Sequence, residues 1–246
     1  MEIASIVLAA GKGTRMKSNL PKVLHPICGK PMINYVVNAA KLSGAKVNVV
    51  VIGHGADAVK ETLGEETQFA IQKEQLGTGH AVLSAKDAIS PDAELILVTN
   101  GDMPLLTEAT LRGLVETQKS NFGPISLLTM LSEAPLGFGR IVRGVDDSVL
   151  AIVEEVQCTP DQLKINELNV GAYCFDAAWL WQSLPKLLLS PKGEYYLTDV
   201  VGLAVQEGKR VAAIQMKDNR EALGINTRVH LAEAEAVMKH RILERH

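Results

Sequence analysis

Near its start the chain reads IASIVLAAGKGTRM, residues 3–16. The run at residues 3–10 is apolar except for Ser5, which is typical of a parallel strand that is covered on both faces. In the loop that follows, Gly11 and Gly13 let backbone N–H groups approach an anion closely, and Lys12 and Arg15 add positive charge. This stretch therefore predicts a phosphate-binding loop at the carboxyl end of a buried strand.

The loop belongs to neither of the two best-known phosphate-binding motifs. It is not a Walker A loop, because no Gly-Lys-Ser/Thr closes it, and it is not a complete dinucleotide fingerprint, because Met16 stands at the third glycine position. Two glycines alone also suit a plain tight turn. A further cation, Lys22, lies in a nearby proline-rich segment that is predicted to be non-helical, and it favours the phosphate hypothesis. A solvated surface lysine is the alternative.

Outward from this loop, apolar runs alternate with amphipathic stretches through the first hundred residues. Strands are predicted at 47–53, 69–72 and 94–100, and helices at 32–45, 56–64 and 79–89. Strands joined through helices must be parallel, so this half predicts a Rossmann-like open α/β sheet. Beyond residue 123 the strand candidates lie closer together, which predicts a mixed, mostly parallel sheet flanked by helices. No linker divides the chain, and one domain is expected.

Composition excludes several classes of protein. Of 246 residues, 47% are hydrophobic and 22% are charged, which is enough apolar material for a sizeable core. The net charge of −3 gives no basic excess for nucleic acid. The longest apolar runs fall far short of the ~20 residues that span a bilayer, and no basic signal region is present. We therefore expect a cytoplasmic protein without a membrane partner. The isolated Cys28, Cys158 and Cys174 are predicted to be free thiols.

Two further loops follow predicted secondary structure at the same sheet edge. Asp102, in TNGDMPLL (99–106), comes after the strongest strand, where a carboxylate can hold Mg²⁺ against a substrate phosphate. The alternative is a helix-capping role, but Thr107 is better placed to cap the next helix. In QLGTGHA (75–81), Gly77, Thr78 and Gly79 let a ligand approach the backbone, although a plain helix start explains them equally well.

With these residues identified, the chain resembles the sugar-1-phosphate nucleotidyltransferases. Within that family it is most similar to the N-terminal uridyltransferase (pyrophosphorylase) domains of the bacterial bifunctional N-acetylglucosamine-1-phosphate uridyltransferase/glucosamine-1-phosphate acetyltransferases. The broad family shares LAAGxGTRM, a following PK and a GD after the central strand. More specific are QLGTGHA, GFGRI (137–141), IVEE (152–155), ELNVGAY (167–173), GEYYLTD (193–199) and GINTR (224–228), which together cover essentially the whole chain.

The resemblance implies site residues at the matching positions. The implied catalytic residues are Arg15, Lys22 and Asp102, and the implied cofactor is Mg²⁺, held by Asp102 and Asn226. The implied nucleotide-binding residues are Leu8, Ala9, Ala10, Gly11, Gly13, Lys22, Gln72, Gly77, Thr78, Asn100, Gly101 and Asp102. The implied sugar-binding residues are Gly139, Glu154, Asn169, Tyr196 and Thr198.

The sequence departs from the family pattern at three places. Asn100 stands where an aromatic residue is common, Glu155-Val156 replaces a more usual His-Lys, and Val170 replaces a threonine beside the implied sugar-binding Asn169. These differences concern the sugar specificity rather than the nucleotidyl transfer.

The bifunctional members continue into a left-handed β-helix that performs acetyl transfer, and this sequence shows no such repeat. The resemblance therefore implies a nucleotidyltransferase domain over residues 1–226 and a connector helix over 227–246. In that helix Leu231, Ala234, Met238 and Ile242 fall at helical spacing. An excised fragment or a stand-alone transferase would both fit. Because members trimerise largely through the β-helix, we expect a monomer, and a trimer if the native protein continues into that domain.

The implied reaction transfers a uridylyl group from UTP to N-acetylglucosamine 1-phosphate and releases pyrophosphate, a step in peptidoglycan and lipopolysaccharide precursor synthesis. In-line attack by the sugar phosphate requires no protein nucleophile. The alternatives are a uridylyl- or thymidylyltransferase for another hexose 1-phosphate, and a non-catalytic nucleotide-sugar sensor. A dinucleotide-dependent dehydrogenase is disfavoured, because Met16 and Gly53 stand where it needs a glycine and an acidic residue.

Overall fold

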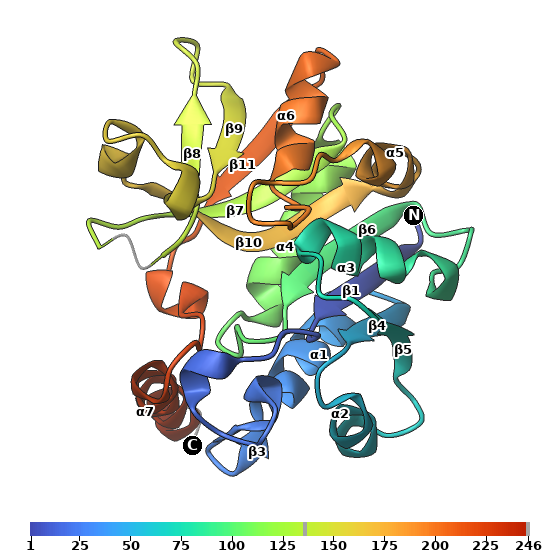
Figure 1. Cartoon of the computed structure of the whole chain (residues 1–246), viewed down its shortest axis with the longest axis vertical. Coiled ribbons are helices and arrows are strands. Elements are labelled where there is room, and N and C mark those ends of the chain that lie inside the picture. The colour runs from blue at the N-terminus through green and yellow to red at the C-terminus, as the bar shows by residue number, and fades with distance from the viewer. Residues whose placement is uncertain (135–136, 245–246) are drawn as a thin grey trace.

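A single nine-stranded sheet organises the molecule. The computed structural model describes residues 1–134 and 137–244. The main path of the sheet has the strand order β11-β7-β10-β6-β1-β4-β5, and β8 and β9 branch from it through β10 (Figure 1). The strands are β1 (Ile3–Leu8), β4 (Val47–Ile52), β5 (Gln68–Ile71), β6 (Leu95–Asn100), β7 (Ile125–Leu131), β8 (Arg140–Arg143), β9 (Val149–Val153), β10 (Glu167–Asp176) and β11 (Val211–Gln215).

The first half of the sheet is parallel. β1 pairs in parallel with β4 on one side and with β6 on the other, and β4 continues in parallel to β5. The register places Leu8 beside Val51 and Asn100, so these strands end at the same edge. The central strands are buried on both faces, which is why they are mostly apolar and show no alternation of polar and apolar residues.

The second half is mixed because β10 reverses direction. β10 pairs antiparallel with β6 and with β7, and β7 pairs in parallel with β11. The register between β10 and β7 shifts between Asn169 and Tyr173, so β10 carries a bulge there. β8 joins the start of β10 and forms an antiparallel pair with β9 that rises from the sheet (Figure 1).

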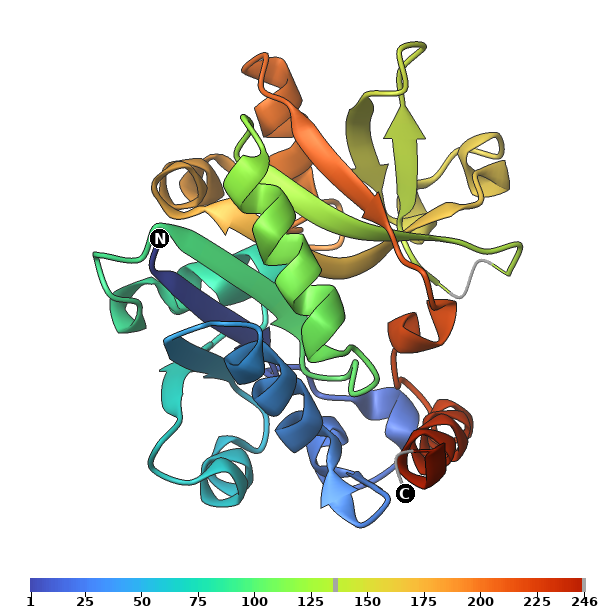
Figure 2. The same ribbon diagram turned by 180° about the vertical axis from the view of Figure 1, so that it is seen from behind.

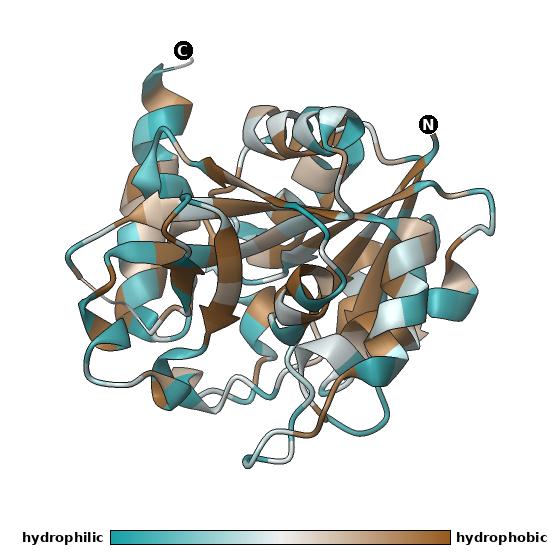
Figure 3. Ribbon diagram, turned by 90° about the horizontal axis from the view of Figure 1, so that it is seen from above, coloured by the Kyte–Doolittle hydropathy of each residue, from teal (hydrophilic) through white to brown (hydrophobic). Residues whose placement is uncertain are grey.

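Helices cover both faces of the sheet. α1 (Met32–Leu42) and α4 (Glu108–Ser120) pack on the face seen in Figure 2, and α3 (Thr78–Ser84), α5 (Ala177–Ser183) and α6 (Asp199–Gln206) pack on the opposite face. α2 (Ala56–Leu63) lies beyond the β4–β5 edge. Two clusters of buried apolar side chains fill the space between the sheet and these helices, one on each face. In Figure 3 the apolar strand segments lie between the helices.

The C-terminal helix returns to the N-terminal half. α7 (Arg228–Glu244) packs beside the short hairpin of β2 (Pro26–Ile27) and β3 (Lys30–Pro31). Cys28, at the turn of this hairpin, donates its backbone N–H to Glu235 Oε1 at 2.9 Å. Residues from the two ends of the sequence therefore build one region of the molecule, as both ribbon views show (Figures 1 and 2).

The structure confirms the predicted Rossmann-like, mostly parallel sheet and changes two local expectations. The proline-rich segment after Lys22 is not simply a loop, because it forms a 3-10 turn at Lys22–Leu24 and then the β2–β3 hairpin. In α7, Ala234 and Met238 are buried, but Ile242 is 38% exposed because the helix packs mainly on the short hairpin. A connector role for residues 227–246 stays a prediction.

Two expectations drawn from composition can also be compared with the structure. Cys28 and Cys158 are half-buried free thiols, and Cys174 is a buried free thiol. In the described ranges 1–134 and 137–244, each helix is too short or too polar to cross a membrane.

A substitution at Phe175 tests how much the buried cluster on the α3, α5 and α6 face contributes to the stability of the fold. Its side chain is fully buried, and its ring stacks on that of Tyr173 with centroids 5.6 Å apart. Phe175→Ala should lower the free energy of unfolding by about 3–5 kcal/mol, because it removes apolar contacts and leaves a cavity. The matched control is Phe122→Ala, at a fully exposed phenylalanine, which should change it by less than about 0.5 kcal/mol. Urea denaturation measures both, and equal effects would contradict the core assignment.

Candidate active site

The main cavity lies where the parallel strands end. Gly101 donates its N–H to Leu8 O at 2.8 Å, and Ala9 donates to Val51 O at 2.8 Å, so the loops after β1, β4 and β6 are tied together. Open α/β sheets bind ligands at this edge. The cavity, about 360 Å³, is lined by Leu8, Ala9, Ala10, Gly11, Lys22, Val23, Gln72, Gln75, Gly77, Thr78, Ala81, Asn100, Asp102, Glu154, Glu194 and Tyr196.

A second cavity of about 180 Å³ adjoins the first on the mixed side of the sheet. The two share Leu8, Thr78, Asn100 and Glu154. The second cavity is also lined by Gly137, Phe138, Gly139, Asn169, Val170, Gly171, Tyr173, Leu197 and Thr198. Most of the predicted nucleotide residues thus line the first cavity, and four of the five predicted sugar residues line the second. Tyr196, predicted for the sugar, lines the first cavity instead.

Two cations meet two oxygen-bearing side chains at the mouth of the main cavity. The Lys22 ammonium contacts the Asp102 carboxylate and lies 3.2 Å from Asn226 Oδ1. The Arg15 guanidinium donates to the same Asn226 oxygen at 2.8 Å. The Lys22 and Asp102 side chains are 16% and 18% exposed, so water screens their attraction only in part. Residues predicted from four separate motifs are thereby gathered into one cluster.

Gly13 and Gly101 do not line the cavity, but the absence of a side chain at each position permits a close contact next to this cluster. Gly13 has φ +61°, and a Cβ there would lie 2.5 Å from Lys22 Cβ, so only glycine lets the loop pass Lys22 so closely. A Cβ at Gly101 would lie 3.0 Å from Leu8 O, in the contact between the ends of β1 and β6. Lys12, by contrast, is exposed and does not line the cavity.

The loop before α3 is joined to the segment before α6. Gly79 donates its backbone N–H to Tyr195 O at 2.8 Å, and Tyr195 donates to Leu76 O at 2.8 Å. The Thr78 hydroxyl oxygen accepts the N–H of Leu197 at 2.9 Å. These bonds fix one wall of the cavity, and Gln72 completes it.

Gln72 is a buried amide that faces the same loop. Its Nε2 donates to Gly77 O at 3.0 Å and lies 3.1 Å from His80 Nδ1. The side chain is 4% exposed, so these contacts fix its orientation in the cavity wall.

Glu154 stands at the wall common to both cavities. Its carboxylate accepts the Thr198 hydroxyl at 2.9 Å. Burial raises the pKa of the Glu154 carboxyl above its usual range, and the Thr198 hydrogen bond counteracts part of that rise. The negative charges of Asp199 and Glu194 raise the pKa further. Burial likewise raises the pKa of Asp199. The Glu154 carboxyl thus offers hydrogen-bonding oxygens in the wall that both cavities share.

Asn169 is held rigidly at the bulge of β10. Its Nδ2 donates to the Tyr173 hydroxyl at 2.7 Å, its Oδ1 accepts the N–H of Gly171 at 3.3 Å, and its own backbone N–H donates to Gly139 O at 2.8 Å. Gly171 has φ +85°, and a Cβ there would lie 2.6 Å from Asn100 Nδ2. Burial raises the pKa of the Tyr173 hydroxyl far above its usual range, so this hydroxyl stays protonated.

Among the residues that line the cavities but are missing from the predicted site are Gln75, Phe138, Tyr173 and Glu194. Each lies inside one of the motifs that carry the family resemblance, so membership of those motifs is the signal that identifies them. Spacing alone gives no such signal, because it does not show which side of a turn faces the cavity.

The predicted metal ligands form a sparse set. Among residues 1–134 and 137–244, no group of three or more His, Cys, Asp or Glu side chains is arranged to hold a metal ion. Asp102 and Asn226 provide two oxygens near one point, with Lys22 between them. A set of this size suits Mg²⁺, which keeps several waters and shares its ligands with a substrate phosphate.

The strand order and the helix layers define a nucleotide-sugar transferase type of fold. A solved structure of UDP-glucose pyrophosphorylase complexed with UDP-glucose superposes with a TM-score of 0.79 at 20% sequence identity, covering 98% of this chain and 100% of that chain. This likeness establishes the fold. Residues 5–145 match the MobA-like NTP transferase domain family, and the chain belongs to that family.

Curated relatives match nearly the whole chain. A Bifunctional protein GlmU from Heliobacterium modesticaldum is 48% identical over 97% of this chain and 52% of its own length. Proteins of the same name from Syntrophotalea carbinolica and Bacillus licheniformis are 46% and 43% identical, over 99% and 98% of this chain and 53% of their own length. The chain spans about half the length of these relatives. The resemblance to the bifunctional proteins that the motifs indicated is thereby confirmed.

Gly77 tests the junction between the two walls of the main cavity. It has φ +95°, and a Cβ there would lie 2.6 Å from Tyr195 O, whereas Gly193, with φ +77°, has open space around it. Alanine at either position should cost about 1–3 kcal/mol of unfolding free energy through backbone strain. Gly77→Ala should cost at least about 1 kcal/mol more, because the Tyr195 backbone must move. Equal midpoints in urea for the two variants would contradict the close approach.

Proposed function

We propose that the protein transfers a uridylyl group from UTP to N-acetylglucosamine 1-phosphate, giving UDP-N-acetylglucosamine and pyrophosphate. The observation that carries this proposal is the pair of adjoining cavities. One is lined by Gly11 of the glycine loop, Lys22 and Asp102, the other is lined by hydrogen-bonding groups suited to a sugar, and Glu154 and Asn100 belong to both. A nucleotide and a sugar phosphate bound side by side would meet at that common wall. The curated relatives support the same assignment.

The nucleotide end is proposed to bind along the tips of the parallel strands. Leu8, Ala9 and Ala10 offer backbone and small side chains to the ribose and base. The Gln72 amide, fixed by Gly77 O, is proposed to hydrogen-bond an edge of uracil, as is the Thr78 hydroxyl. Gly11 has open space where a Cβ would stand, so its backbone can approach the phosphates.

The phosphates are proposed to be held by charge rather than by covalent chemistry. A sugar-phosphate oxygen attacks the α-phosphorus in line, and the bond to the β-phosphate oxygen breaks as pyrophosphate leaves. Lys22 offsets negative charge that grows on the α-phosphoryl oxygens, and Arg15 with the loop N–H groups holds the departing pyrophosphate. Both cations now contact Asp102 or Asn226 and must turn toward the phosphates when the nucleotide binds.

Asp102 and Asn226 are proposed to hold Mg²⁺. Their oxygens already attract two cationic side chains, so the local electrostatics suit a cation, and carboxylate and amide oxygens are hard donors of the kind Mg²⁺ takes. When bound, the ion supplies positive charge to the phosphate oxygens at the reacting centre.

The second cavity is proposed to bind the acetylated sugar. The Glu154 carboxylate is proposed to accept a hydrogen bond from a sugar hydroxyl, as it does from the Thr198 hydroxyl. The backbone N–H of Asn169 donates a hydrogen bond to Gly139 O. The Asn169 side chain and the Gly139 backbone are proposed to hydrogen-bond the hydroxyls and the acetamido group of the sugar. Tyr196 and Thr198 close the wall near that group.

The assay that tests the function measures pyrophosphate release with Mg²⁺ and a matrix of nucleoside triphosphates and sugar 1-phosphates. Release that is fastest with UTP and N-acetylglucosamine 1-phosphate supports the proposal. Release with another hexose 1-phosphate alone reassigns the sugar, and nucleotide-sugar binding without any release indicates a sensor.

Asp102→Ala tests the charged metal ligand. It should reduce kcat by about 10³-fold or more while leaving the thermal midpoint nearly unchanged, because a carboxylate at a strand end contributes little packing. The matched control is Asp146→Ala, at an exposed aspartate of the β8–β9 turn, which should keep full activity. Retention of most activity by Asp102→Ala at saturating Mg²⁺ would sink the metal assignment.

Asn169→Ala tests the sugar specificity. A pocket built to pair with an acetamido group leaves polar atoms unsatisfied around a 2-hydroxyl sugar, so the protein should favour the N-acetyl sugar by on the order of 10²-fold. The variant should lower kcat/KM for N-acetylglucosamine 1-phosphate much more than for glucose 1-phosphate. Loss of folded protein would lower both kcat/KM values by the same factor, so their ratio controls for it. An unchanged ratio would remove Asn169 from sugar recognition.

A further inference from the structure

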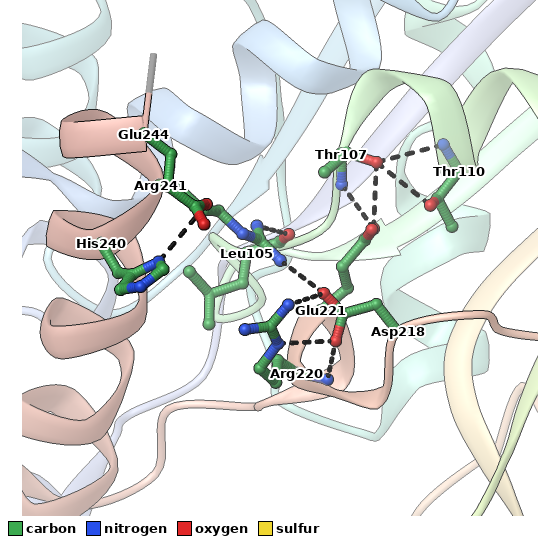
Figure 4. A network of polar contacts seen from close by, with 9 residues as sticks. All are labelled: Leu105, Thr107, Thr110, Asp218, Arg220, Glu221, His240, Arg241 and Glu244. Atoms are coloured by element: carbon green, nitrogen blue, oxygen red, sulfur yellow. Dashed lines mark hydrogen bonds and ion pairs between the residues drawn. The ribbon is translucent and has the colours of Figure 1, made fainter. Parts of the chain in front are cut away.

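Glu221 is a buried carboxylate that the proposed chemistry does not use. It lies in the 3-10 turn Asn219–Ala222 and is 8% exposed. Its Oε2 accepts the backbone N–H of Thr107 at 2.9 Å and the Thr107 hydroxyl at 3.0 Å (Figure 4). A buried charge is costly unless it is hydrogen-bonded, so a specific arrangement must retain it.

The partner of Glu221 is the residue that starts α4. Thr107 is the N-cap of α4, and its hydroxyl oxygen accepts the N–H of Thr110 at 3.2 Å. Glu221 therefore lies against a helix N-terminus, where free N–H groups and the helix dipole favour a negative charge. This contact joins the loop after β6 to a turn 114 residues further along the chain.

The same two segments meet again at the proposed metal ligands. Ile225 is fully buried and donates its backbone N–H to Asp102 O at 2.9 Å. Asn226 follows directly, and its Oδ1 faces Lys22 and Arg15. Residues 221–226 are thus bonded to residues 102–107 at both ends, so the position of Asn226 relative to Asp102 depends on these two attachments.

α7 adds a third attachment to the same loop. Arg241 donates to Leu105 O at 2.7 Å, and its guanidinium lies 3.6 Å from Asp218, which also pairs with Arg220 at 2.9 Å (Figure 4). Arg241 thus bridges the loop and the turn that carries Glu221.

We infer that Glu221 is a positioning residue for the metal site: by binding Thr107 it holds Asn226 beside Asp102, where the two side chains would hold a divalent cation. The inference rests on the proposed function, since it takes Asp102 and Asn226 as the ligands. Outer partners of metal ligands act in this way when they fix ligand geometry. Glu221 touches neither substrate, so its loss should change metal dependence and leave sugar recognition intact.

The test measures Mn²⁺ binding to the free full chain by electron paramagnetic resonance, beside the Mg²⁺ concentration for half-maximal pyrophosphate release. Glu221→Ala should raise both the Mn²⁺ Kd and that Mg²⁺ concentration by about 10-fold, with KM for the sugar phosphate nearly unchanged. Glu221→Gln keeps the shape and one acceptor oxygen, and it should recover most of the affinity. Thr107→Ala, which removes the hydroxyl contact from the other side, should raise the same two quantities by a smaller factor and serves if Glu221→Ala does not fold.

Two comparisons separate positioning from general destabilisation. Glu207→Ala removes a glutamate bonded to Trp179 and Lys186 far from the site, and it should leave the Mn²⁺ Kd unchanged. In an Asn226→Ala background, Glu221→Ala should add no further loss of Mn²⁺ affinity, because it acts through Asn226.

The outcomes also distinguish this inference from the proposed function. If Asp102→Ala loses Mn²⁺ affinity while Glu221→Ala and Thr107→Ala keep it, Glu221 has no positioning role and the metal site stands. An equal loss in Glu207→Ala, or full additivity with Asn226→Ala, likewise overturns the inference. If Asp102→Ala binds Mn²⁺ as the unmutated protein does, the proposed metal site itself fails.

Discussion

The parallel pairing of β1 with β4 and β6 is the constraint on which the rest of the structure depends. It brings three loops to one sheet edge, and the bonds Gly101 N–H to Leu8 O and Ala9 N–H to Val51 O hold the strand ends in register. A side chain at Gly101 would press on Leu8 O, so the contact between these strand ends requires a residue without one. The phosphate loop, the Asp102 loop and the cavity between them all follow from this junction.

The reversed strand β10 gives the sheet its second compartment. An antiparallel strand beside β6 runs its polypeptide past the strand tips, where a parallel strand would turn away into a helix. The bulge at Asn169–Tyr173 then breaks the ladder with β7 and leaves polar groups beside the cavity. One direction of pairing thus builds the side proposed for the nucleotide, and the other builds the wall proposed for the sugar.

Much of the fold follows from local sequence, and much of the site does not. The runs 3–10, 47–53 and 94–100 predict their strands because burial on both faces favours mostly apolar residues without a polar alternation. Motifs identify the residues that line the cavities. The β2–β3 hairpin and the exposure of Ile242 depend on what packs nearby, which periodicity does not contain. Contacts such as Glu221 with Thr107 join residues more than a hundred positions apart, and neither residue type marks the other.

The return of the C-terminal segment to the N-terminal half sets an order of events during synthesis. A ribosome delivers the parallel strands, the glycine loop and Asp102 well before residues 218–241. Until residues 218–241 emerge, the Asp102 carbonyl lacks the hydrogen bond from the Ile225 backbone N–H, and the Asn226 oxygen is absent from the cluster. A nascent chain can therefore form most of its sheet while the cation cluster is still incomplete. Assembly of the cluster is thereby coupled to the synthesis of residues 218–241, which follow the parallel strands by more than a hundred positions.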